Sequence, residues 1–270
     1  MSVFKLVTIT SLSLAALLNV AQAETLSARE IMERVDDRDT GDSSVSDANL
    51  ILIDRNNRER VRDLRLYSLE EAGVTRAVTY FLAPTDVAGT SYLSYDHDNQ
   101  EDEAWLYLPA LKQVRRVAAG DRSNSFMGSD FSYSDLNGTT LEWYDYELLS
   151  DDESVDGHPV WKIESRPKPE FADQVSNETG YERSHLWIRK DNFMQVQGQI
   201  WVERGGRVKY FSARDIEEVD GIWTAHRIQM ITTRNGEREH GSVFQINEVT
   251  YNDHTDPSLF TTQAMQRGLN

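Results

Sequence analysis

Segments with the pattern of half-buried strands follow one another from about residue 50 to residue 251 of the chain. Residues 74–82, VTRAVTYFL, are rich in the Val, Thr and aromatic residues that favour strands. In residues 195–202, Val196, Ile200 and Val202 share one face of an extended chain with Gly198, and glutamines occupy the other face. Such alternation predicts strands that bury one face of a sheet.

Turn signals punctuate the last third of the sequence. Gly205-Gly206, Asp220-Gly221 and Asn235-Gly236 recur about every 15 residues between segments rich in strand-forming residues. They predict a meander of long antiparallel strands over residues 194–203, 208–218, 222–234 and 239–251, which suits a wide, curved sheet. Asn137-Gly138 and Asp156-Gly157 indicate earlier turns, and Pro257 opens a short terminal segment with Leu259, Phe260 and Met265.

One helix is indicated near the start of the chain. Ile31, Met32 and Val35 form an apolar stripe at helical spacing within residues 28–37, and Thr25 or Ser27 supplies the cap. The polar residues 36–47 then predict a loop. Since the composition does not shift further on, we expect one domain over residues 24–270, a large antiparallel sheet with this helix and short middle segments against its concave face.

The first 23 residues have the pattern of a signal peptide. Lys5 precedes an apolar run over residues 6–20, and Ala21-Gln22-Ala23 has the small residues of a cleavage site. No later stretch is apolar for ten residues, so we expect no membrane anchor. The chain has no Cys to carry a lipid or a disulfide.

Cleavage of this leader is expected after Ala23. N-terminal sequencing of exported protein should therefore begin at Glu24, and a retained leader would contradict the prediction.

Composition and charge narrow the classes of partner. Hydrophobic residues make up 39% of the chain, enough to form a core, and 28 Lys and Arg stand against 45 Asp and Glu. The formal net charge of −17 repels the phosphates of nucleic acids and anionic lipids. We therefore expect no nucleic-acid partner and no binding to bare anionic membranes.

No motif for catalysis or metal binding is present. The six histidines lack metal-ligand spacing, and the chain has no nucleotide-binding loop or nucleophile elbow. Asp96 begins a calcium-like loop, but the sixth position is not Gly and Tyr107 stands in place of the bidentate Glu. We expect neither an enzyme nor a bound cofactor or metal.

Residues 104–136 are apolar and aromatic but are interrupted by Pro109, Gly120 and Gly128. One interpretation is a core cluster that contains a buried ion pair between an arginine and an aspartate. The other is a mobile flap over a lipid-sized cavity, in which the aromatic and Met side chains contact the ligand. The candidate ligand-binding residues are Trp105, Tyr107, Phe126, Met127, Phe131 and Tyr133, and the candidate ion-pair or gating residues are Arg115, Arg116, Asp130 and Asp135.

Three motifs in this region resemble the outer-membrane lipoprotein-sorting protein family of LolA-like domains. They are Pro84-x-Asp86-x2-Gly89-Thr90, WLYLPALKQVRR at 105–116 and FMGSDFSYSDL at 126–136, and the similarity extends to Asp220-Gly221. The resemblance implies an all-β fold with short helices, an unclosed antiparallel half-barrel with helices in its concave mouth, in a Gram-negative periplasm. It also implies a concave apolar face for acyl chains, an arginine that holds the closed state, for which Arg115 and Arg116 are candidates, and inner-membrane transporters of the resistance-nodulation-division type as partners.

Two functions follow from these expectations. The first is a periplasmic carrier that shelters the acyl chains of a lipoprotein or lipid and transfers them between membrane partners. The second is a sensor or adaptor that docks on envelope proteins or a lipid-exporting transporter without carrying lipid. Lipid that co-purifies with the protein discriminates between them.

Overall fold

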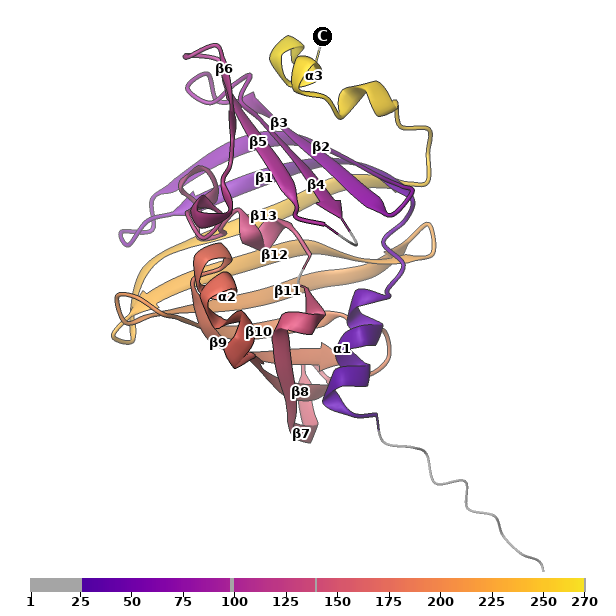
Figure 1. Ribbon diagram of the computed structural model, residues 1–270, viewed down its shortest axis with the longest axis vertical. Coiled ribbons are helices and arrows are strands. Elements are labelled where there is room, and N and C mark those ends of the chain that lie inside the picture. Colours follow the sequence, from indigo (N-terminus) through magenta and orange to yellow (C-terminus); the bar gives the residue numbers. More distant parts are fainter. Residues whose placement is uncertain (1–25, 98–99, 139, 270) are drawn as a thin grey trace, which may run out of the picture.

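A single antiparallel sheet dominates the computed structural model, which describes residues 26–97, 100–138 and 140–269 (Figure 1). The predicted leader lies outside the described residues. The sheet has 13 strands in the order β6-β5-β4-β3-β2-β1-β13-β12-β11-β10-β9-β8-β7. Its strands are β1 (Ser43–Ile53), β2 (Glu59–Glu71), β3 (Val74–Ala83), β4 (Ser91–His97), β5 (Glu103–Leu108), β6 (Gln113–Arg116), β7 (Tyr144–Val155), β8 (His158–Pro167), β9 (Tyr181–Arg189), β10 (Gln195–Val202), β11 (Arg207–Val219), β12 (Ile222–Arg234) and β13 (Glu237–Tyr251).

The helices are short and few by comparison with the strands. They are α1 (Ala28–Asp36), α2 (Ala172–Glu178), α3 (Thr262–Arg267) and the 3-10 turns η1 (Ala119–Asp121), η2 (Phe126–Gly128), η3 (Ser134–Leu136), η4 (Leu141–Trp143), η5 (Pro169–Phe171) and η6 (Pro257–Leu259). Neighbouring strands are consecutive in sequence except where β1 meets β13, so two meanders join there. The two edge strands, β6 and β7, do not pair with each other in the described residues, which confirms the predicted unclosed half-barrel.

The predicted hairpins form because their turn residues suit the twist of the sheet. Asp220 and Asn235 both have φ 53°, and the glycines that follow them have φ 86° and 84°. Two successive residues with positive φ give the turn that matches right-handed strand twist. The four strands predicted for the last third are thereby confirmed as β10 to β13.

Two local expectations at the start of the chain have different outcomes. The predicted helix is present as α1, and its cap is Ser27, which forms a capping box with Glu30. The predicted loop over residues 36–47 is too long, because β1 already begins at Ser43. Polar Ser43 pairs with Leu69 of β2 and Ser44 with Tyr251 of β13, so backbone pairing on both sides outweighs the turn-rich composition.

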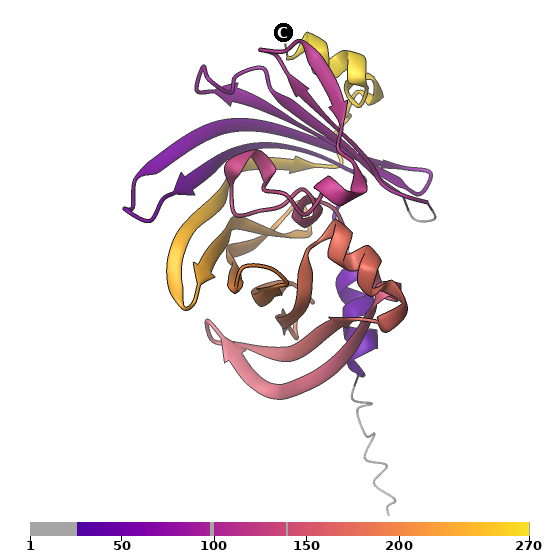
Figure 2. The same ribbon diagram turned by 60° about the vertical axis from the view of Figure 1, so that its left-hand side comes forward.

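The sheet curves, and different segments cover its two faces. Figure 2 shows that residues 117–138 and 140–143, here called the middle segment, and α2 lie on the inner side, whereas α3 lies outside. On the outer face, Phe260 and Met265 are fully buried against Val78, Tyr80 and Leu93. The short helices in the concave mouth confirm the predicted fold class, and the extent of the domain over residues 24–270 stays a prediction.

Candidate functional site

A cavity of about 480 Å³ lies between the concave face of the sheet, the middle segment and α1. Its floor is apolar and comes from four neighbouring strands. Ile228 and Met230 are two residues apart on β12, so they point to the same side, and register brings Phe211 and Phe244 beside them. The floor residues are Ile200, Phe211, Ile228, Met230 and Phe244.

The walls of the cavity contain both apolar and polar residues. Met32 and Val35, from the predicted stripe of α1, line it together with Leu136 of the middle segment. Polar groups gather elsewhere in the lining: Asp36, Asp102, Arg122, Asn137 and Glu178. Burial, together with the neighbouring negative charges of Asp37 and Glu142, raises the pKa of Asp36. The cavity can therefore hold a molecule with one apolar and one polar part.

Arg122 is the buried arginine of this wall, and no sequence pattern identifies it. It is only 6% exposed. Its guanidinium donates to the backbone carbonyl of Asp102 and to the Glu178 carboxylate at 3.2 Å, which ties the middle segment to the end of α2. A single Arg in a polar stretch carries no pattern, so only its position in the fold identifies it.

The structure corrects the placement of Trp105 and Tyr107. Both side chains point to the outer face, where they pack against the cluster beneath α3. The Trp105 ring is 5.2 Å from that of Tyr95 on the next strand. Leu106, which alternates with them, packs against the concave cluster instead. Trp105 and Tyr107 therefore do not line the cavity.

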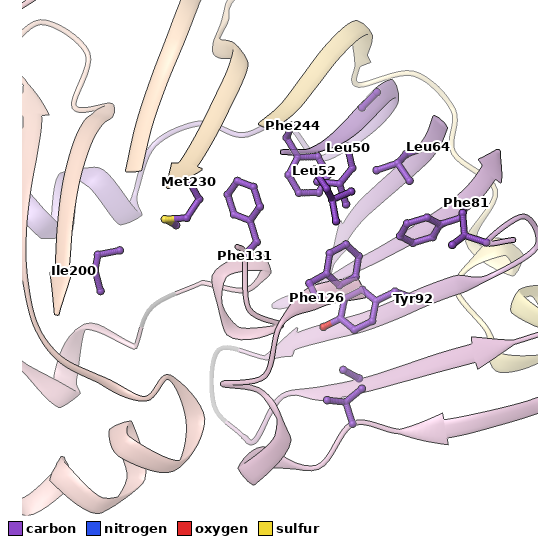
Figure 3. Close-up of a cluster of buried hydrophobic side chains, with 14 residues drawn as sticks. Leu50, Leu52, Leu64, Phe81, Tyr92, Phe126, Phe131, Ile200, Met230 and Phe244 are labelled. Atoms are coloured by element: carbon purple, nitrogen blue, oxygen red, sulfur yellow. The ribbon is translucent and has the colours of Figure 1, made fainter. Parts of the chain in front are cut away.

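The other four aromatic and Met candidates lie in the middle segment and pack against the concave face of the sheet. Phe126 is fully buried, with its ring 5.4 Å from Tyr92 and 5.9 Å from Phe81 (Figure 3). Phe131 lies 5.1 Å from Phe244 and lines the cavity. Met127 and Tyr133 are partly buried at the edge of the same cluster. The middle segment is thus part of the core, and the role of these residues in binding stays a prediction.

The proposed pairing of Arg115 or Arg116 with Asp130 or Asp135 is wrong. Both arginines are exposed on the edge strand β6, where Arg116 faces Glu103 of β5 at 3.5 Å and Arg115 faces Gln113. Their contacts come from β6 itself and from β5, the strand that pairs with β6.

Asp130 instead fastens the middle segment to strands β12 and β13. Its carboxylate accepts hydrogen bonds from Thr232, His240 and Ser242, the last at 2.7 Å, and its backbone N–H donates to the Ser242 hydroxyl at 2.9 Å. Burial alone would raise the pKa of Asp130, but these hydrogen bonds, foremost that of His240, hold the pKa below its ordinary value. The hydrogen bond from Asp130 in turn raises the pKa of His240.

Asp135 makes a second attachment, to β9 and β11. It accepts hydrogen bonds from the Tyr181 hydroxyl at 2.7 Å and from Lys209 Nζ at 3.3 Å, while the Ser132 N–H donates to it at 2.7 Å. Burial, and then the charge of Asp135, raise the pKa of Tyr181, which stays a hydrogen-bond donor. Asp130 and Asp135 thus fasten the middle segment to the sheet at two places.

Replacing His240 with Gln is expected to lower the free energy of unfolding by about 1 kcal/mol at roughly pH 5. This loss is smaller than the contribution of a fully buried charged hydrogen bond, because the His240 side chain is half exposed. A raised His240 pKa gives stability that is full below the ordinary value of 6.5 and lost as pH rises through the raised pKa. A lowered Asp130 pKa gives stability that is present above 3.8 and lost as pH falls through the lowered pKa. The pair therefore stabilises most between these values.

Melting temperatures of wild type and His240→Gln, measured across the range from acid to alkaline pH, test this prediction. The difference between the two proteins should be largest near pH 5, by the same linkage, and shrink above neutrality. A difference that is constant across the range would contradict it.

Comparisons with known proteins agree with this architecture. A family model described only as an uncharacterized protein matches residues 73–267. A solved domain from Vibrio parahaemolyticus, described as an outer membrane lipoprotein-sorting protein, is 27% identical with a TM-score of 0.78, over 89% of this chain and 98% of that one. A DUF1329 family protein from Desulfovibrio piger is 28% identical with the same TM-score, over 88% and 97%. No curated protein sequence matches the chain.

A LolA superfamily protein from Nitrosomonas europaea shares the fold, with 18% identity and a TM-score of 0.64 over 89% of this chain and all of that one. The fold and cavity thus define a LolA-like half-barrel protein. The chain belongs to the family of the matching model, and a structural relative of 27% identity is described as an outer-membrane lipoprotein-sorting protein. None of the helices in the described part of the chain is both long and apolar enough to span a membrane.

Proposed function

We propose that this protein is a periplasmic carrier that shelters an acyl chain of a lipoprotein or lipid and transfers it between membrane partners. The observation that supports this proposal is the cavity floored by Ile200, Phe211, Ile228, Met230 and Phe244. Its volume of about 480 Å³ is within the range of sites for small molecules, ~300 to 1,000 Å³. An acyl chain buried there gains ~0.8 kcal/mol for each methylene removed from water, and no catalytic step is needed.

Release of such a ligand is the harder step, because burial of many methylenes adds to a large free energy of binding. The hydrogen bonds that hold the middle segment on the sheet offer a way to change the free energy of ligand binding. Asp130 and Asp135 hold the segment through polar contacts that a partner protein can exchange for its own. A partner that breaks them would expose the cavity and lower the affinity for the chain.

The compartment and the partners belong to the same proposal. The signal-peptide pattern at residues 1–23 and the lipoprotein-sorting relative support an exported, periplasmic protein. The family resemblance suggests an inner-membrane transporter of the resistance-nodulation-division type as one partner.

Lipid carried by the native protein is the direct test. Protein purified from the periplasm without detergent should yield lipid in organic extracts at a stoichiometric ratio, measured by mass spectrometry against a known amount of protein. Protein in which Ile228 is replaced by Glu should yield much less. Extracts without stoichiometric lipid from the wild type would contradict the carrier.

An adaptor that carries no lipid is the alternative, and the closed packing around Phe126 favours it. That side chain is fully buried among Phe81, Tyr92 and Tyr133, so this part of the middle segment is core and not a loose flap. An adaptor would give lipid-free extracts and would not take up an acyl probe.

A further inference from the structure

A second pocket, of about 260 Å³, lies at the hairpin end of the sheet, between the β1–β2 and β12–β13 hairpins and the middle segment. Arg238 Nη1 donates to Asn57 Oδ1 at 3.1 Å, which joins the two hairpin tips. The lining is mostly polar and charged: Asp54, Arg55, Arg58, Arg60, Asp130, Glu239 and His240 are among its residues. We call it the rim pocket.

Positive charge is concentrated around the rim pocket although the whole chain carries −17. Residues 54–62, 203–207 and 234–239 together contain eight arginines and five acids. These segments are neighbours in space, since β11 and β12 pair Arg207 with Arg234 and β12 pairs with β13. This end of the half-barrel is therefore a basic patch on an acidic protein.

The carboxylates of the rim pocket are already engaged. Asp54 Oδ2 pairs with Arg58 at 2.7 Å, and Glu239 pairs with Arg207 at 2.7 Å and Arg234 at 3.0 Å. Asp130 is bound by His240. Among the residues that the structure describes, no carboxylate lies within ion-pair distance of Arg55 or Arg60, so two guanidinium groups at this pocket lack a counter-charge.

We propose that the rim pocket binds a phosphate group through Arg55 and Arg60. Guanidinium groups bind phosphate oxygens with paired, charge-assisted hydrogen bonds, and the pocket offers two such groups with Arg58 beside them. The engaged carboxylates reduce the repulsion that an anion would meet there. The source of the phosphate is either a lipid headgroup or inorganic phosphate.

The position of the pocket relates it to the apolar cavity. Gly128 and Asp130 line the rim pocket, and the next residue, Phe131, lines the cavity. A single stretch of the middle segment therefore separates the two pockets. A phospholipid with its phosphate at the rim would have its acyl chains directed toward this partition. Only this lipid version rests on the proposed carrier function.

Titration calorimetry with inorganic phosphate at low ionic strength tests the site itself. The variant Arg55→Gln/Arg60→Gln should bind phosphate at least tenfold more weakly than wild type. The control Arg115→Gln/Arg116→Gln loses the same charge at exposed positions on β6 and should bind like wild type. Melting temperatures check that both variants fold. Absent phosphate binding in wild type, or an equal loss in both variants, would overturn the proposal.

A second arm identifies the source with dihexanoyl phosphatidic acid, measured in the same proteins. If this lipid binds at least tenfold more tightly than inorganic phosphate and the rim variant loses that binding, the ligand is a lipid headgroup. Equal affinity for the two identifies inorganic phosphate and supports the site as well. Phosphate binding that persists in protein unable to take up a neutral acyl probe would refute the carrier and leave the rim pocket in place.

Discussion

Wild-type protein freed of lipid is expected to bind a fluorescent fatty-acyl probe, and Ile228→Glu is expected to weaken that binding by about 100-fold. Ile228 is only partly buried because its side chain is part of the cavity floor, beside Met230 and Phe244. A carboxylate there would lose its water when an acyl chain enters. That desolvation costs about 3 kcal/mol or more, which corresponds to ~100-fold in affinity.

A matched control is available on the same strand. Gln229 is the next residue of β12 and faces the outer side of the sheet, so Gln229→Glu adds an equal charge away from the cavity. This control should bind the probe like wild type. Equal binding by Ile228→Glu with an unchanged melting temperature would show that the probe does not occupy this cavity.

Phe126→Ala is expected to destabilise the protein by about 3 to 5 kcal/mol, because the change leaves a hole in a fully packed cluster. Phe126 contacts aromatic rings of β3 and β4 as well as Tyr133, so its loss weakens the attachment of the middle segment to the sheet. Urea unfolding followed by tryptophan fluorescence measures the change.

Leu111→Ala provides the comparison for this effect. Leu111 is also an apolar residue between β5 and the middle segment, but it is 49% exposed, so its truncation should change stability by less than ~0.5 kcal/mol. Similar small effects for both substitutions would mean that the middle segment is a loose flap and not part of the core.

Local sequence signals predicted the sheet well because they act over a few residues. The Asp-Gly and Asn-Gly turns determine their hairpins through their own backbone conformation. The alternation of apolar and polar residues over 195–202 matches the alternating burial of strand β10. In the same local way, the capping box of Ser27 and Glu30 determines where α1 begins. The strand over Ser43–Asp47 was missed because it depends on partners at least 18 residues away.

The faces of β5 show why the site was harder to predict. Period-two spacing shows that Trp105 and Tyr107 share a face, but the intervening Leu106 and Leu108 are apolar too. Which pair faces the concave side depends on the C-terminal segment, whose Phe260 and Met265 come from the far end of the chain and cover the outer face. Without that contact both faces of β5 look equally suited to a core.

Charges were misassigned for a related reason. Asp130 accepts hydrogen bonds from Thr232, His240 and Ser242, which are more than 100 positions away in the sequence. Its proximity in sequence to Arg115 and Arg116 therefore did not predict its partners. The net charge of −17 likewise concealed the basic patch, since its arginines come from three hairpins that only the sheet brings together. The expected repulsion of anionic lipid therefore does not apply to that end of the molecule.

The central claim is that an acyl chain lies on the concave floor of this half-barrel. Nuclear Overhauser effects between a bound fatty acid and the methyl groups of the protein, labelled at Ile and Met, test it most directly. The carrier predicts contacts from acyl methylenes to Ile200, Ile228 and Met230. Contacts only to Met265 of α3 on the outer face, or none in a saturated sample, would contradict it.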